Sequence, residues 1–78
     1  MEKQLNIYTK HYCPYCNVLK NFLKEKEIPF TEIEVSDKPS VHREVIQKTG
    51  HRTVPAVFVG EQFIGGSEDF YEWYSQNS

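Results

Sequence analysis

Two spacings of apolar residues alternate along the first half of the chain. Residues 5–9 (LNIYT) place apolar side chains on one face of an extended segment, which predicts a short strand. After Pro14, apolar residues return every three or four positions, which predicts a helix that ends near Glu27. Residues 30–35 (FTEIEV) alternate between apolar and polar and predict a second strand. This order predicts a βαβ unit whose strands are parallel and whose crossover is right-handed.

A second helix is predicted after the second strand. Residues 36–40 (SDKPS) are typical of a turn that leads into a helix. Val41, Val45 and Ile46 then recur on one face and supply its buried stripe. Gly50 stands where a glycine commonly ends a helix.

The last third of the chain predicts a hairpin and a final helix. Residues 56–59 (AVFV) are continuously apolar, as in a strand inside a sheet. A tight turn at 60–61 leads into residues 62–64 (QFI), which we expect to form an antiparallel edge strand. Ser67 is the expected N-cap of the last helix, and the two acidic residues after it complement the helix dipole.

Length and composition limit the classes of protein that remain. With 78 residues, 38% hydrophobic and 14% aromatic, we expect one folded α/β domain over residues 1–78. The net charge of −2 argues against a nucleic-acid partner. No apolar run approaches the ~18 residues of a membrane span, and residues 1–10 lack the apolar stretch of a signal peptide. Two cysteines are too few for a secreted disulfide scaffold, so we expect a cytoplasmic protein.

The candidate chemistry lies in the motif Cys13-Pro14-Tyr15-Cys16, which begins a predicted helix directly after a strand. The nucleophile of thiol–disulfide exchange is a thiolate, which the N–H groups and dipole of a helix N-terminus stabilise. We therefore expect Cys13 to be the exposed nucleophile. Cys16 lies one turn deeper on the same face, where it can resolve a mixed disulfide formed by Cys13.

Two other roles for this cysteine pair are less favoured. A structural zinc site needs about four ligands, and the histidines that could join the thiols have no paired spacing, so we expect no metal. A purely structural disulfide would close a very short loop and add little stability. We expect the histidines to be solvent-exposed instead: His11, His42 and His51.

Three motifs together resemble those of the glutaredoxin family. They are Cys13-Pro14-Tyr15-Cys16, Thr53-Val54-Pro55 before a strand, and Gly65-Gly66-Ser67-Glu68-Asp69 at the start of the last helix. The chain resembles a small dithiol glutaredoxin over essentially its whole length. The resemblance implies a thioredoxin-like fold, in which three helices flank a four-stranded mixed sheet. It also implies glutathione-dependent thiol–disulfide exchange, with glutathione as co-substrate.

The same resemblance implies a glutathione site on both sides of the cysteine motif. Lys10 matches the family lysine that pairs with the glycine carboxylate of glutathione, and Tyr15 matches the tyrosine that lines the groove. The Val54–Pro55 bond is expected to be cis, which leaves the Val54 backbone free to pair with glutathione as an added strand would. Thr53 flanks this site and is expected to contribute a hydrogen bond.

The start of the last helix is the expected site for the γ-glutamyl end of glutathione. Gly66 allows close approach, and the N–H groups of Ser67, Glu68 and Asp69 can hold a carboxylate at a helix N-terminus. The Asp69 carboxylate would pair with the glutamyl amine. Capping of the helix explains the same polar residues equally well, although a cap does not need two consecutive glycines.

One departure from the family pattern and two rival functions stay open. Many glutaredoxins carry a basic residue just after the second cysteine, where this chain has Asn17 and Val18, so Lys10 or Lys20 would have to stabilise the thiolate. One rival is a glutaredoxin-like electron donor recharged by thioredoxin reductase. The other is an iron–sulfur carrier that shares a cluster through Cys13 and glutathione, against which the proline after Cys13 argues. Otherwise we expect a monomer that acts on glutathionylated or disulfide proteins such as ribonucleotide reductase, with NADPH entering indirectly through glutathione reductase.

Overall fold

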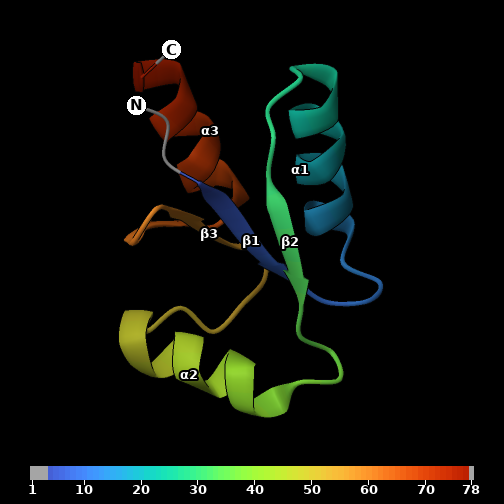
Figure 1. Ribbon diagram of the computed structural model, residues 1–78, viewed down its shortest axis with the longest axis vertical. Coiled ribbons are helices and arrows are strands. Elements are labelled where there is room, and N and C mark those ends of the chain that lie inside the picture. Colours follow the sequence, from blue (N-terminus) through green and yellow to red (C-terminus); the bar gives the residue numbers. More distant parts are fainter. Residues whose placement is uncertain (1–3, 78) are drawn as a thin grey trace.

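The computed structural model describes residues 4–77 and contains four strands and three helices within them (Figure 1). In chain order the elements are β1 (Leu5–Thr9), α1 (Pro14–Glu25), β2 (Thr31–Glu34), α2 (Pro39–Thr49), β3 (Ala56–Val59), β4 (Gln62–Gly65) and α3 (Ser67–Asn77). None of the helices within residues 4–77 is long and apolar enough to cross a membrane. Two predictions fall partly outside the described residues. They are the two ends of the expected 1–78 domain and the first residues of the stretch that is expected to lack a signal peptide.

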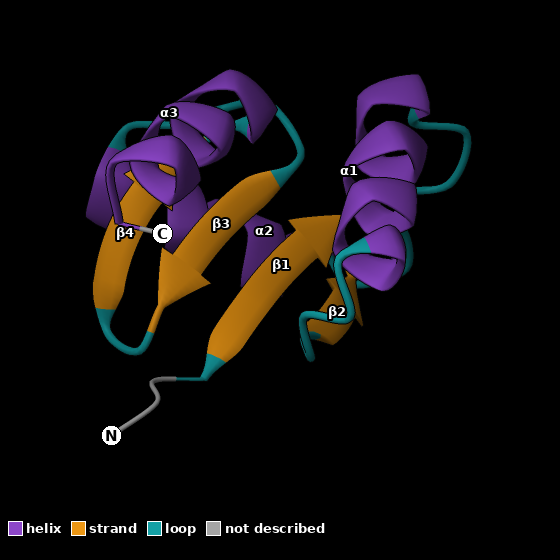
Figure 2. Cartoon of the chain, turned by 90° about the horizontal axis from the view of Figure 1, so that it is seen from above, coloured by secondary structure: helices purple, strands orange, loops and turns teal. Residues whose placement is uncertain are grey.

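The strands form one mixed sheet in the order β2-β1-β3-β4. β1 and β2 are parallel, whereas β3 is antiparallel to both β1 and β4. Figure 2 shows α1 and α3 on one face of the sheet and α2 behind the other face. This arrangement confirms the expected four-stranded mixed sheet flanked by three helices.

The main hydrophobic core lies between the sheet and the α1–α3 pair. Its members are buried apolar residues from β1, α1, β3 and α3: Leu5, Ile7, Leu19, Leu23, Val57, Val59 and Phe70. The ring of Phe22 meets the rings of Phe70, Tyr71 and Tyr74 edge-on, at centroid distances between 5.1 and 6.4 Å. Aromatic contacts of this kind stabilise beyond the area they bury, so they hold the C-terminal half of α1 against α3.

Helix α1 ends at Glu25, two residues earlier than the spacing of its apolar residues predicts. Glu27 has a φ of 58°, and its N–H donates to the Lys24 carbonyl while the N–H of Ile28 donates to the Leu23 carbonyl. These are the two hydrogen bonds of a Schellman motif, which ends a helix by a left-handed residue. The apolar residue after that turn packs on the core, so tertiary packing sets the end of the helix.

Two further boundaries differ from the sequence-based prediction. Strand β2 is shorter than the predicted 30–35, because Val35 continues the pairing only by donating its N–H to the Thr9 carbonyl. Helix α3 begins at Ser67, so the predicted N-cap residue is itself helical. Gly66 takes the cap position instead: its carbonyl accepts from the N–H of Phe70 at 2.9 Å.

Three further predicted features are present. Gly50 ends α2 with a φ of 76° and donates its N–H to the Ile46 carbonyl. On the buried stripe of α2, Val45 is buried, and Val41 and Ile46 are half-buried. Strands β3 and β4 form the expected hairpin, with a register shift next to Val57.

Candidate functional site

Cys13 caps the N-terminus of α1, directly after β1 and the short connection that follows it. Its extended backbone (φ −106°, ψ 103°) and Pro14 at the first helical position are both typical of a helix start. The N–H of Cys16 donates to the Cys13 sulfur at 3.2 Å. The sulfur thus occupies the position of a capping side chain, where a backbone N–H is available to stabilise a thiolate.

The expectation of an exposed Cys13 is wrong. Only 8% of the residue is accessible, because the capping position turns the sulfur toward the first turn of the helix. The thiol also lies 3.8 Å from the Val54 carbonyl oxygen, to which it donates a long hydrogen bond. The sulfur of Cys13, the candidate nucleophile, therefore faces the Val54 loop rather than bulk solvent.

Cys16 lies deeper, as expected, with 1% of its surface accessible. Burial, followed by the hydrogen bond with Cys13, raises the pKa of its thiol to about 12. Cys16 is therefore a protonated thiol at neutral pH. Both cysteines are free, so the structure represents the reduced dithiol.

The Val54–Pro55 peptide bond is cis, as the family resemblance implies. The loop that contains it connects α2 with β3 and reaches the N-terminus of α1 through the contact between the Cys13 sulfur and the Val54 carbonyl. Two motifs that are 41 residues apart in sequence thereby form one site.

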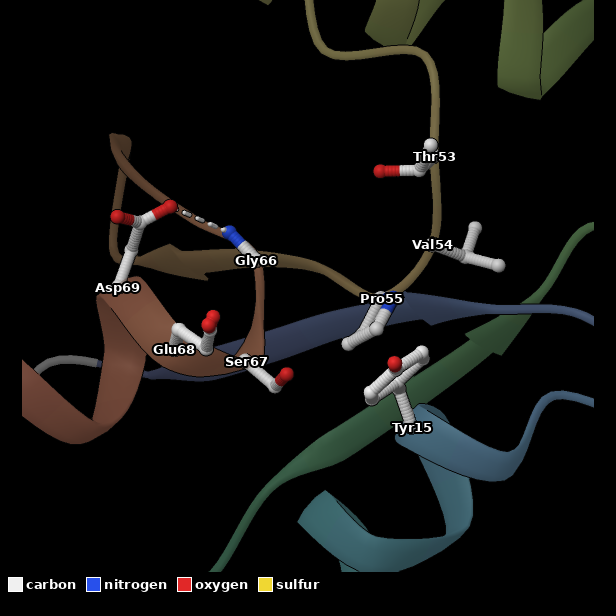
Figure 3. A pocket seen from close by; sticks show the side chains of 8 residues that line it. All are labelled: Tyr15, Thr53, Val54, Pro55, Gly66, Ser67, Glu68 and Asp69. Carbon is white, nitrogen blue, oxygen red and sulfur yellow. Dashed lines mark hydrogen bonds between the residues drawn. The ribbon is translucent and has the colours of Figure 1, made fainter.

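An open cavity of about 500 Å³ lies beside this contact (Figure 3). In Figure 3, the Tyr15 side chain rises from α1 toward Pro55, and the start of α3 forms the opposite wall. With 69% of its surface exposed, Tyr15 has no role in the core. The lining residues are Tyr15, Thr53, Val54, Pro55, Gly66, Ser67, Glu68 and Asp69.

These eight residues are eight of the nine that the resemblance assigns to glutathione. The structure therefore brings together side chains from three separate motifs. The exception is Lys10, an exposed residue just after β1 that does not line the cavity. Its backbone instead forms a hydrogen bond with the Cys16 thiol, which lowers the pKa of Cys16 against the larger effect of burial.

The α3 wall of the cavity has a specific backbone geometry. The N–H of Gly66 donates to Asp69 Oδ2 at 3.1 Å, which is the back-bond of a capping box. Gly65 has a φ of 129°, and a Cβ at this position would collide with the Asp69 carboxylate. The next N–H groups of α3 lie in its first turn, where they have no helical partner and can bind an anion.

We expected all three histidines to be solvent-exposed, but His42 and His51 are not. His51 Nε2 lies 3.3 Å from both the Pro55 carbonyl oxygen and Thr53 Oγ1, so its ring contacts two residues that line the cavity. His42 Nε2 is buried without a hydrogen-bond partner in residues 4–77. Burial lowers the pKa of His42, and the charges of Lys10 and His51 lower it further. Neither histidine lies in a recognisable motif, so only the tertiary structure reveals these positions.

His11 is exposed, as expected, and lies in a small polar cluster. Its Nδ1 is 3.3 Å from the Glu34 carboxylate, and its Nε2 is 3.9 Å from that of Asp37. Among residues 4–77 this is the one group of three potential metal ligands, and it includes neither cysteine. It is solvent-exposed and lies outside the cavity.

A polar network lies beneath the cysteine turn. The buried Thr9 hydroxyl donates to Glu32 Oε2 at 2.6 Å, and Lys20 Nζ lies 2.9 Å from the same oxygen. The Thr9 hydrogen bond, followed by Lys20, holds the pKa of Glu32 below its usual value. Lys20 is one helical turn after Cys16, and its ammonium group is paired with Glu32 rather than free for a thiolate.

Comparison with known proteins gives a consistent result. The family model described as glutaredoxin matches residues 5–64. Glutaredoxin 3 of Escherichia coli is 39% identical over 67 residues, which are 86% of this chain and 81% of that protein. A glutaredoxin of Pseudomonas aeruginosa is 40% identical over 65 residues, or 83% and 77% of the two chains.

Solved structures agree with these sequence matches. A crystal structure of a buckwheat glutaredoxin–glutathione complex superimposes with a TM-score of 0.86 at 32% identity, covering 96% of this chain and 71% of that one. The solution structure of a glutaredoxin from Brucella melitensis gives 0.80 at 33% identity, covering 96% and 82%. The sheet and helices described above are therefore those of the thioredoxin-like fold. The chain belongs to the glutaredoxin family and is a glutathione-dependent thiol–disulfide oxidoreductase.

Proposed function

We propose that Cys13 is the nucleophile of this glutaredoxin and Cys16 its resolving thiol. The observation that carries this assignment is the asymmetry of their surroundings. The Cys13 sulfur accepts a backbone N–H and contacts Val54 in the cavity wall, whereas Cys16 is buried and its pKa is raised to about 12. A thiol that stays protonated does not compete for the first attack.

With a glutathionylated protein, only Cys13 is required. Its thiolate attacks the glutathione sulfur, the mixed disulfide breaks, and the protein thiolate leaves and takes up a proton. A second glutathione thiolate then attacks the glutathione sulfur on Cys13. Glutathione disulfide is released and the Cys13 thiolate is restored, so each cycle consumes one free glutathione, and the other half of the glutathione disulfide comes from the substrate.

With a protein disulfide, both cysteines take part. Cys13 attacks one sulfur of the substrate, and the second substrate sulfur leaves as a thiolate. Cys16 loses its proton and attacks the Cys13 sulfur, which releases the reduced substrate and leaves a Cys13–Cys16 disulfide. Two glutathione molecules then reduce this disulfide. Cys16 is well placed for the second step, because its backbone N–H already touches the Cys13 sulfur.

We propose the cavity as the glutathione site. Its two ends match the two ends of the tripeptide: the Cys13 sulfur near Val54 would face the glutathione thiol, and the start of α3 would hold the γ-glutamyl carboxylate. The backbone of Val54 would pair with the cysteine residue of glutathione. Lys10, outside the cavity, would reach the glycine carboxylate.

The physiological setting that fits this chemistry is a reducing one. We propose a cytoplasmic monomer that acts on glutathionylated proteins and on disulfide proteins such as ribonucleotide reductase. Glutathione reductase would return glutathione disulfide to glutathione with electrons from NADPH.

A coupled assay tests the proposal. The purified protein is given a small glutathione mixed disulfide and glutathione, and NADPH oxidation is followed through glutathione reductase. A parallel reaction replaces glutathione and its reductase with thioredoxin reductase. Turnover with glutathione alone is the expected result. Turnover with thioredoxin reductase alone would contradict the proposed electron source and the glutathione cavity.

A further inference from the structure

The ring of His51 touches the loop wall of the cavity at two points. Its Nε2 atom lies 3.3 Å from the Pro55 carbonyl oxygen and 3.3 Å from Thr53 Oγ1. A carbonyl oxygen can only accept, so the proton of the ring is on Nε2 in this arrangement. The Nε2–H group therefore bridges Thr53 and Pro55, the residues on either side of Val54.

The same ring lies against the opposite wall. An added Cβ at Gly66 would be 3.5 Å from His51 Cε1 and 3.7 Å from the Pro55 carbonyl oxygen, which are ordinary contact distances. The ring and this carbonyl thus lie directly against the glycine turn that begins α3. Gly66 is itself tied to α3 through its bond to Asp69.

Contacts with α2 and β4, outside the cavity, fix the position of His51. Its backbone N–H donates to Thr49 Oγ1 at 3.0 Å, and this hydroxyl donates to the Val45 carbonyl at 2.7 Å. On the other side, the ring of Phe63 in β4 lies 5.4 Å away, centroid to centroid. Because α2 and β4 fix the ring, the ring can in turn determine where the loop lies.

We propose that His51 is a positioning residue that sets the distance between the Val54 backbone and the start of α3. This inference rests on the proposed function, because both walls must bind one tripeptide at the same time. No hydrogen bond joins the ring to the Cys13 sulfur within residues 4–77, so its role is in substrate affinity rather than in sulfur transfer. His51 is thereby added to the glutathione-binding residues predicted from the sequence, as a residue that acts through the two walls of the cavity.

Steady-state kinetics with a small glutathione mixed disulfide provide the test. Loss of the bridging N–H in His51→Ala should raise KM about tenfold, with a much smaller change in kcat. His51→Gln should restore most of the affinity, because its amide N–H has nearly the reach of Nε2. Gln47→Ala, an exposed change on α2, is the matched control and should leave both constants unchanged.

Amide NMR spectra of the same variants separate this inference from the proposed function. His51→Ala should shift the signals of Thr53, Val54 and Gly66 together, and His51→Gln should return them toward wild type. If the wild-type protein turns over the mixed disulfide and the KM of His51→Ala is unchanged, the positioning role is wrong and the proposed function stands. If the wild type shows no turnover, the proposed function fails. In the NMR spectra of His51→Ala, shifts confined to the loop, without a shift of the Gly66 signal, would overturn the positioning role.

Discussion

At the scale of single residues, the two cysteines differ because their surroundings differ. They share one turn of α1, yet the Cys13 sulfur receives an N–H and faces the Val54 loop, while Cys16 is enclosed. Enclosure disfavours the charged form of Cys16, which explains its raised pKa. The motif by itself places both sulfurs on one face but does not show how far each is from solvent.

Replacing each cysteine separately tests this division of roles. Cys13→Ser should abolish both activities, because the only other thiol in residues 4–77 is the buried Cys16. Cys16→Ser should retain deglutathionylation and lose the reduction of protein disulfides. The two activities are measured side by side with a glutathionylated peptide and a disulfide protein. Equal losses in the two variants would contradict the assignment.

The glycine pair offers a second prediction at this scale. Gly65→Ala should lower the free energy of unfolding by about 2–4 kcal/mol, because the added Cβ meets the Asp69 carboxylate in a left-handed backbone. Gly50→Ala is the matched control: its φ is also positive, but the space around it is open, so about 1 kcal/mol is expected. Urea unfolding of both variants measures the difference. Equal losses would show that backbone conformation alone, and not the contact with Asp69, requires Gly65.

At the scale of elements, helix ends are determined by capping and packing as much as by apolar spacing. Helix α1 stops at a Schellman motif that places a glutamate, Glu27, in the left-handed region. Helix α3 starts one residue earlier than a serine cap would imply, since Gly66 and Asp69 form the cap between them. Both differences come from hydrogen bonds that apolar periodicity does not describe.

The end of α1 leads to a prediction about stability. Glu27→Gly should raise the free energy of unfolding by about 0.5–1 kcal/mol, because glycine adopts a φ of 58° without the steric cost that a Cβ brings. Glu25→Gly, at the last residue of the same helix, should lower it by up to about 1 kcal/mol. Chemical denaturation of the two variants checks the opposite signs. A loss of stability in Glu27→Gly would contradict the role given to the Schellman motif.

At the scale of the whole molecule, the Glu32 carboxylate connects three elements of the fold. It accepts from Thr9 in β1, belongs to β2, and pairs with Lys20 in α1. The network lies beneath the turn that carries Cys16, whose pKa is lowered slightly by the charge of Lys20. It therefore helps to hold α1, and with it the cysteine motif, over the parallel strands.

This network makes stability depend on pH in a defined direction. The pKa of Glu32 is lower in the folded protein, so its contribution is complete above the ordinary pKa of Glu, about 4.3, and is lost as the pH falls through the lower folded value. Glu32→Gln should therefore destabilise the protein more at pH 7 than in acid. Glu44→Gln, an exposed change on α2, is the control. Urea midpoints at several pH values measure the effect, and parallel curves for wild type and Glu32→Gln would contradict it.

The sequence by itself determined the order of elements, the place of the cysteine motif at a helix start and the set of residues that resembles a glutathione site. These features follow from local spacing and from short motifs, in which neighbours in the chain are neighbours in space. Only the tertiary structure decided how accessible Cys13 is, that Lys10 lies outside the cavity, and that His51 lies between its walls. The physical reason is that burial and side-chain contacts depend on segments that are distant in the chain, and no local pattern records which of them meet.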